Sequence, residues 1–172
     1  YCGARYCVST NSGTSALHLA LLAHRIGEGD EVITQPNSFF ATAEAISYTG
    51  ATPVFADVEP DTWGIDAAKI TPALTPRTKA ILPVHLYGNA ADLDAIKRVA
   101  KKRHLVVIED AAQAHGTLYQ GRKIGSFGNT ACFSFYPGKV LGAYGEGGAV
   151  VTDNPRIAEK IRMLRDHGQK RK

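Results

Sequence analysis

The sequence predicts an α/β protein with three layers (α/β/α) and a mostly parallel sheet. Strand-like and helix-like patterns alternate along the chain, as in proteins whose helices cover both faces of a sheet. Residues 105–108 form a fully apolar run of the kind that makes a buried parallel strand. Of the 172 residues, 44% are hydrophobic and 21% are charged, which fits one globular domain or a large piece of one.

The first half of the chain begins with a strand and a helix. This helix has N-capping hydroxyls at Ser12 and Thr14 and an expected C-terminal stop at Gly27. A turn-rich stretch around Pro60 ends this half. The expected elements are a strand at 5–10, a helix at 14–26, a strand at 31–34, a helix at 41–48 and a strand at 53–56.

The second half continues the alternation and ends on a helix. The patterns place strands at 79–84, 105–108, 130–135 and 148–152, and helices at 92–103 and 154–165. The first of these helices is amphipathic, and its buried face is expected to hold Leu93, Ile96, Val99 and Ala100. Ligands of such sheets bind at the carboxyl ends of the strands, so polar residues that follow a strand are the candidates for chemistry.

Charge and cysteine content exclude several classes of protein. The net charge of +4 comes without interleaved aromatic residues, so no nucleic-acid surface is expected. No run of about 18 apolar residues occurs, so no membrane span is expected. Three cysteines without paired spacing predict reduced thiols and a cytoplasmic location, and no ligand spacing indicates a metal. The chain begins with Tyr1 and has Met163 as its only methionine, which indicates a piece of a longer protein.

Three candidate sites follow predicted strands. Residues 11–15 (NSGTS) lie between a strand and a helix, where free amides and hydroxyls bind phosphate, although an ordinary helix cap fits them as well. Asp110 follows the most apolar strand and either points into the ligand crevice or caps a helix, whereas Glu109 beside it faces the opposite way. Lys139 is isolated among small and apolar residues, where a lysine deprotonates easily and forms a Schiff base, although a surface loop lysine is the simpler alternative.

Together, these three features are the parts of a pyridoxal phosphate site. The lysine forms the Schiff base with the cofactor, and the phosphate-binding turn holds its phosphate. The aspartate keeps the pyridine nitrogen protonated, so that the ring can stabilise a carbanion. The combination is far more specific than any one of its parts.

Four motifs in this order resemble the DegT/DnrJ/EryC1/StrS family of pyridoxal-phosphate-dependent sugar aminotransferases, which have the aspartate aminotransferase fold (fold type I). The resemblance runs from about Val8 to Gly168. One departure is Val140, since many relatives have asparagine directly after the lysine. The motifs are SGTSAL (12–17), PVHLYG (83–88), EDAAQAHG (109–116) and SFYPGK (134–139).

The resemblance implies a role for each site residue. Lys139 is the Schiff-base lysine, which also shuttles the substrate proton, and Asp110 is the partner of the pyridine nitrogen. Gln113 contacts the phenolic oxygen of the cofactor. The phosphate-binding residues are Gly13, Thr14, Ser15 and, as a second contact, Ser134. Phe39 stacks on the ring; the alternative, a core phenylalanine, fits its neighbour Phe40 better. His85 and His115 receive no role and are expected to be hydrogen-bonded structural residues.

The resemblance also implies a function. The expected reaction moves an amino group, with glutamate as the expected donor, to a nucleotide-linked keto sugar in amino-sugar or polysaccharide biosynthesis. The expected protein is a homodimer, of which residues 1–172 are part of the large cofactor-binding domain, without the N-terminal lead-in and the small C-terminal domain. Two alternatives are a sugar dehydratase, disfavoured because such relatives replace Lys139 with histidine, and a non-catalytic regulatory protein on the same fold.

Overall fold

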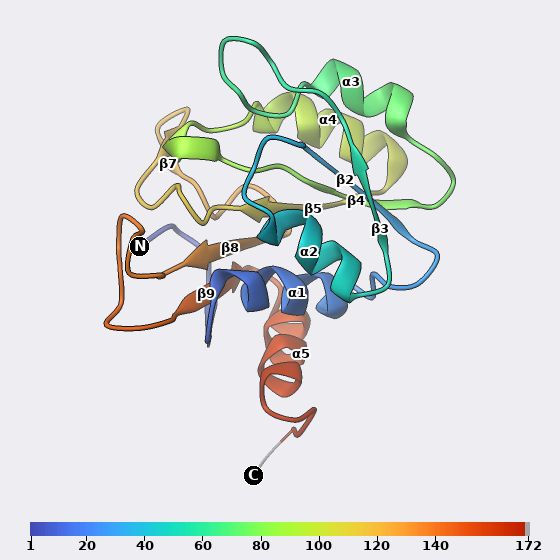
Figure 1. Cartoon of the computed structure of the whole chain (residues 1–172). Helices are drawn as coiled ribbons and strands as arrows, with labels where there is room; N and C mark the ends of the chain where they lie inside the picture. Colours follow the sequence, from blue (N-terminus) through green and yellow to red (C-terminus); the bar gives the residue numbers. More distant parts are fainter. Residues whose placement is uncertain (171–172) are drawn as a thin grey trace.

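The computed structural model describes residues 1–170. A seven-stranded sheet in the order β1-β9-β8-β5-β4-β2-β3 forms its centre (Figure 1). Strands β8, β5, β4, β2 and β3 are parallel, and β9 is antiparallel to both β8 and β1. The strands are β1 Tyr6–Thr10, β2 Glu31–Thr34, β3 Thr52–Phe55, β4 Thr78–Leu82, β5 Val106–Asp110, β8 Thr130–Ser134 and β9 Gly148–Thr152.

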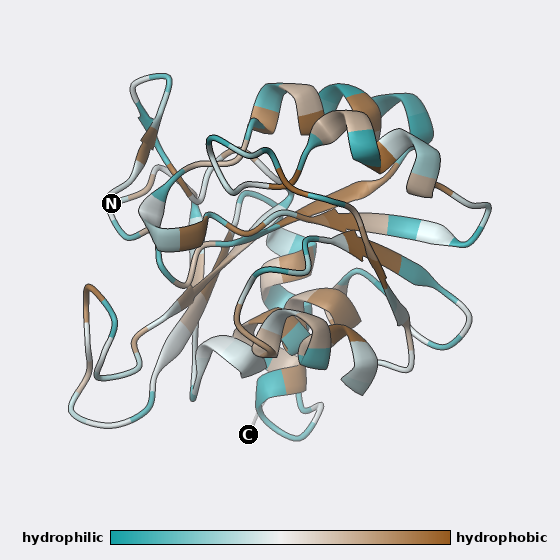
Figure 2. Ribbon diagram, turned by 45° about the horizontal axis from the view of Figure 1, so that its top comes forward, coloured by the Kyte–Doolittle hydropathy of each residue, from teal (hydrophilic) through white to brown (hydrophobic). Residues whose placement is uncertain are grey.

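Helices cover both faces of the sheet, which confirms the predicted three-layer α/β class (Figure 1). Helices α1, α2 and α5 share one apolar core with the sheet, in which Leu21, Ile46 and Ile161 are buried. Helices α3 and α4 share a second core, with Ile70 and Ile96. Figure 2 shows apolar colouring on strands that lie between the two helix layers. The helices are α1 Gly13–Ala23, α2 Ala41–Tyr48, α3 Ala67–Ala73, α4 Leu93–Arg103 and α5 Pro155–Arg165.

The first helix ends earlier than predicted. It stops at Ala23 rather than at residue 26, because Arg25 adopts a left-handed backbone (φ 61°). The amide of Arg25 donates to the carbonyl of Leu22, and that of Ile26 to the carbonyl of Leu21. This is the Schellman pattern, with arginine at the position where glycine is usual, so Gly27 is not the stop.

Short elements were absent from the prediction. Helix α3 has only seven residues and contains Pro72, but the carboxylate of Asp66 accepts the amide of Ala68 and caps it. A two-residue hairpin (β6 Leu118–Tyr119, β7 Arg122–Lys123) and a 3₁₀ turn (η1 Leu86–Gly88) were missed as well. On α4, Leu93, Ile96 and Ala100 are buried as predicted, whereas Val99 is half-buried.

Strand β5 is longer than predicted, and this extension matters for the site. It continues to Asp110, two residues beyond the predicted end, because Asp110 pairs with Val84, just past the end of β4, and with Cys132 on β8. Two adjacent carboxylates therefore lie at the carboxyl end of the central strand. None of the helices in residues 1–170 combines the length and apolar character that crossing a bilayer requires.

Candidate active site

A cavity of about 410 Å³ opens where β5 and β8 end and α1 begins. It contains every predicted site residue except Ser15. That serine instead donates its amide to the Ser12 hydroxyl (3.0 Å) and so belongs to the helix cap. The lining is made by Ser12, Gly13, Thr14, Leu17, Phe39, Ala41, Thr42, Val84, Asp110, Ala112, Gln113, Ser134, Tyr136, Lys139 and Glu146.

One corner of the cavity suits an anion. Helix α1 starts here, and the amides of Gly13 and Thr14, its first two residues, lack partners within the helix, whereas that of Ser15 is held by the cap. Ser134, at the end of β8, lies directly against Gly13, since a Cβ built on that glycine would be 2.6 Å from the Cβ of Ser134. Only glycine lets the helix start approach the strand this closely. The result is a pair of elements whose polar groups converge on one point, as phosphate binding requires.

Asp110 forms the floor of the cavity. Its side chain is buried, with the residue 4% exposed. Its Oδ2 accepts from the Thr42 hydroxyl (2.8 Å), and its Oδ1 accepts from the Ala112 amide (3.1 Å), so it faces the cavity and also caps the following turn. Burial raises the pKa of Asp110, while these two hydrogen bonds and the charge of Lys139 act in the opposite direction.

Glu109 faces away from the cavity, as the alternation of a strand predicts. It accepts from Nε2 of His85 (3.2 Å) and from the amides of Gly125, Phe127 and Gly128. His85 is fully buried, and its other ring nitrogen, Nδ1, accepts from the Ala91 amide (3.2 Å). The expectation of a hydrogen-bonded structural histidine is therefore confirmed for His85.

Gln113 is oriented by a neighbouring turn. Its Oε1 accepts from the backbone amide of Tyr87 (2.8 Å), a residue with a left-handed backbone (φ 56°) in the 3₁₀ turn. With the oxygen engaged there, the NH₂ group of Gln113 is free to donate elsewhere, and Gln113 lines the cavity.

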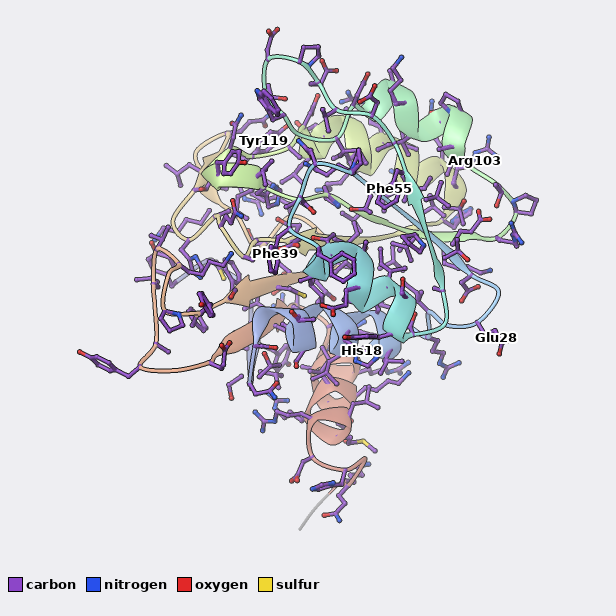
Figure 3. All side chains as sticks on the ribbon, in the orientation of Figure 1. His18, Glu28, Phe39, Phe55, Arg103 and Tyr119 are labelled. Atoms are coloured by element: carbon purple, nitrogen blue, oxygen red, sulfur yellow. The ribbon has the colours of Figure 1, made fainter. Side chains whose placement is uncertain are left out.

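Lys139 and Phe39 line the cavity from two different segments of the chain. Lys139, in the loop between β8 and β9, is half-buried, and its Nζ lies 6.0 Å from the centre of the Phe39 ring. Figure 3 shows Phe39 beside the first turn of α2. Phe39 and Phe40 are both 71% exposed, so the interpretation of Phe40 as a core residue is wrong. Both side chains precede the buried face of α2, which begins at Ala41.

His115 differs from its expectation. Its ring packs against Phe133 (5.3 Å between centroids) and Phe135 (5.4 Å). Both ring nitrogens are buried, and neither has a hydrogen-bond partner of normal geometry among residues 1–170. Burial lowers the pKa of His115, and the charge of Lys139 acts in the same direction. A weak contact with the backbone of Ser134 acts in the opposite direction. The half-buried ring is therefore held mainly by packing against the two phenylalanines rather than by hydrogen bonds.

Sequence reasoning assigned no role to three polar residues of the cavity, Thr42, Tyr136 and Glu146. Thr42 is the one polar side chain among the buried residues of α2, a position that only the fold reveals. Glu146 lies in a glycine-rich loop without periodicity, and no pattern in the sequence separates it from an ordinary exposed glutamate.

Comparison with known proteins decides the family. The model of the DegT/DnrJ/EryC1/StrS aminotransferase family matches residues 1–172. The chain belongs to this family. Among curated relatives, it is 51% identical over 172 residues to dTDP-3-amino-3,4,6-trideoxy-alpha-D-glucose transaminase of Streptomyces venezuelae, covering 100% of the chain and 45% of the relative. It is 50% identical over 168 residues to GDP-perosamine synthase of Caulobacter vibrioides, covering 98% of the chain and 45% of the relative.

Solved structures of the family have the same fold. The chain superimposes on Streptomyces venezuelae DesV, described as a complex with a ketimine intermediate, with a TM-score of 0.97 and 51% identity over 100% of the chain and 46% of DesV. It also superimposes on ntda of Bacillus subtilis, described with bound cofactor pmp. Here the TM-score is 0.88 and the sequence identity 42%, over 93% of the chain and 36% of that protein. The chain spans about half the length of the relatives it matches.

Proposed function

We propose that this chain is part of the large cofactor-binding domain of a pyridoxal-phosphate-dependent aminotransferase that acts on a nucleotide-linked keto sugar. The observation that carries the proposal is the convergence of three groups on one cavity. These are the amine of Lys139, the carboxylate of Asp110 and the anion-binding corner of Gly13 and Ser134. Relatives at about 50% identity are named as transaminases of such sugars, which supports the substrate class.

The residues of the cavity fit this cofactor. Its volume of about 410 Å³ is in the range of small-molecule sites. The two hydrogen bonds that Asp110 accepts leave acceptor positions for a protonated ring nitrogen. The free NH₂ group of Gln113 suits the ring oxygen, and the exposed ring of Phe39 suits stacking. Ser134 and the first turn of α1 suit the phosphate.

When bound, pyridoxal phosphate supplies an electron sink for the carbanion formed at the substrate Cα. Within that scheme, Lys139 holds the cofactor at its aldehyde carbon and moves a proton at Nζ. Asp110 holds the proton on the ring nitrogen, because an ionised carboxylate in a buried site favours a charged partner. Gln113 and Phe39 fix the plane of the ring. Glutamate is the proposed amino donor.

We also propose a cytoplasmic homodimer. Several large apolar side chains near the cavity mouth and in the Lys139 loop are exposed, among them Phe39, Tyr136, Leu141 and Tyr144. Apolar groups gathered in this way are typical of a surface covered by another chain. All three cysteines are free, which is consistent with a reducing compartment.

Two other functions remain as alternatives. A non-catalytic role has some support, since a Geobacillus stearothermophilus relative at 51% identity is named "Pleiotropic regulatory protein". A cavity that keeps Lys139, Asp110 and Gln113 together favours catalysis over that role. Dehydration is disfavoured by Lys139, as the sequence already indicated.

An absorbance titration tests the proposal. The wild-type protein with pyridoxal phosphate is expected to give a borohydride-reducible band near the visible edge, which glutamate converts to a shorter-wavelength form. Lys139→Ala is expected to lose this band. Lys101→Ala, on the exposed face of α4, is the matched control and is expected to keep it. No cofactor band in the wild type, or an identical band in Lys139→Ala, would contradict the aminotransferase proposal and favour the non-catalytic role.

A further inference from the structure

A buried hydroxyl joins the start of α2 to the end of β5. Thr42 is 2% exposed, and its Oγ1 donates to Oδ2 of Asp110 (2.8 Å), a residue 68 positions later in the chain. The same Oγ1 lies 2.9 Å from the hydroxyl of Ser38, four residues earlier and before α2 begins. In Figure 1, α2 begins beside the carboxyl end of β5, which allows this contact. The three side chains therefore form a row that ends at the floor of the cavity.

The direction of the hydrogen bonds follows from the chemistry of the groups. An ionised carboxylate only accepts, so the Thr42 hydroxyl must give its single proton to Asp110. The oxygen of Thr42 is then left as an acceptor. The Ser38 hydroxyl lies 3.3 Å from the carbonyl of Phe39 and 2.9 Å from Oγ1 of Thr42, so it donates to Thr42 as the nearer acceptor. Two hydroxyl dipoles are thus aligned toward one carboxylate. Hydrogen bonds to a charged acceptor are stronger than neutral ones, and aligned chains strengthen each other.

This arrangement orients the Asp110 carboxylate. The Ala112 amide holds Oδ1, and Thr42 holds Oδ2, so both oxygens are fixed and the carboxylate plane cannot rotate freely. The remaining acceptor positions belong to the side that lines the cavity. Thr42 itself also lines the cavity, so it lies at the boundary between the core and the site.

The charge of Asp110 depends on the same contacts. Burial raises the pKa of Asp110, and the Thr42 hydroxyl is the largest of the opposing influences, ahead of the Ala112 amide and the charge of Lys139. His85, which donates to Glu109, also lies nearby. Two further titratable groups lie close: Cys132 is its register partner on β8, and Glu109 precedes it on β5. Neither donates a hydrogen bond to Asp110 among residues 1–170, so Thr42 is the side chain that favours the ionised form by direct contact.

We propose that Thr42, assisted by Ser38, is a positioning residue that holds the Asp110 carboxylate ionised and aimed at the ring nitrogen of the cofactor. The identity of that cofactor rests on the proposed function, whereas the effect of Thr42 on Asp110 does not. Thr42→Val removes the hydroxyl at nearly constant shape, and Thr42→Ser keeps the hydroxyl. The pair therefore separates the hydrogen bond from the packing of α2.

The first measurement needs no cofactor. The protein is labelled with ¹³C at aspartate carboxyl groups, and the Asp110 signal, assigned by its loss in Asp110→Asn, is titrated in the wild type and both variants. Thr42→Val is expected to move the titration of Asp110 to higher pH, because the carboxylate loses its strongest donor. Thr42→Ser is expected to titrate like the wild type. Equal titration of Thr42→Val and wild type would overturn the inference.

The second measurement is the dissociation constant for pyridoxal phosphate, obtained by equilibrium dialysis at pH 8. Loss of one hydrogen bond to a charged group predicts about tenfold weaker binding for Thr42→Val, and less than about threefold for Thr42→Ser and Ser38→Ala. Wild-type binding with an unaffected Thr42→Val would overturn the inference and leave the proposed function intact. No binding by the wild type would overturn the proposed function, and the carboxyl titration would still decide the role of Thr42.

Discussion

Glu109 and Asp110 are adjacent carboxylates on one strand, and the two faces of β5 treat them differently. Both are buried, at 0% and 4% exposure. Glu109 accepts from four donors, one from His85 and three from the backbone of residues 125–128. Asp110 accepts from two, and its other acceptor positions belong to the cavity. A buried carboxylate stabilises the fold when groups of the fold donate to all its acceptor positions. A buried carboxylate with unused acceptor positions can still accept a hydrogen bond from a ligand.

On the face of β5 that carries Glu109, His85 and Gly128 bring hydrogen-bond donors close to the carboxylate. Nδ1 of His85 accepts the Ala91 amide, so its proton is on Nε2, which donates to Glu109. A Cβ on Gly128 would lie 2.8 Å from the carbonyl of Val107, so the loop approaches β5 only because glycine is there. Every group around Glu109 is thus specified by contacts within the fold, and none lines the cavity.

The largest expected effect is on the cavity side. Asp110→Asn replaces the carboxylate with an amide that cannot compensate a positive charge on a ring nitrogen. We expect the rate of amino transfer from glutamate to fall about 10²–10⁴-fold, with the fold retained. Single-turnover absorbance measures this rate, and Asp61→Asn, in an exposed loop, is the control. A variant with wild-type rate would show that Asp110 has no role that Glu109 lacks.

The next largest effect concerns Glu109 and the free energy of unfolding. Glu109→Gln keeps one oxygen for the amides of Phe127 and Gly128, but its NH₂ group faces two donors, Nε2 of His85 and the amide of Gly125. Two buried donors left unpaired cost about 2–6 kcal/mol, at roughly 1–3 kcal/mol each. Urea denaturation measures the loss, with Asp110→Asn as the matched variant one residue away. Equal stability of the two variants would break the distinction between the two faces.

The sequence predicts the features of β5 that depend on neighbouring residues better than those that depend on residues far apart in the chain. Alternation along a strand is local, so the opposite orientation of Glu109 and Asp110 was predictable. The family motifs brought Lys139, Asp110 and Gln113 into one site, and the structure places all three around one cavity. The helix and strand patterns likewise predicted the three-layer fold.

The remaining features depend on contacts that periodicity does not carry. The contact from Thr42 to Asp110 spans 68 residues, and α2 appears in the sequence only as a helix with small residues. Helix α3 was missed because seven residues with an internal proline give too little pattern, although its Asp66 cap was visible. The stop at Arg25 was missed because an arginine in a left-handed conformation has no sequence signature of the kind glycine gives.

The smallest expected effect is a pH dependence of stability with opposite signs for the two carboxylates. Burial raises the pKa of Asp110 above its usual value near 3.9, so the folded state binds this proton before the unfolded state does. Acidification through the folded pKa toward about 3.9 therefore stabilises the fold. Burial also acts to raise the pKa of Glu109, but hydrogen bonds from His85 and the loop amides outweigh it and lower the pKa. Its contribution is complete above about pH 4.3 and is lost as the pH falls through its folded pKa.

Melting temperatures of the wild type and both variants between pH 7 and pH 3 test these signs. The deficit of Glu109→Gln is expected to be constant above about pH 4.3 and to shrink below it, because the wild type then loses the interaction that the variant already lacks. Relative to Asp110→Asn, the wild type is expected to gain stability as the pH falls toward about 3.9, because only the wild type can relieve a buried charge by protonation. If both differences changed in the same direction, the two carboxylates would share one electrostatic environment. The number of acceptor positions used within the fold would then not explain why Glu109 stabilises the fold while Asp110 lines the cavity.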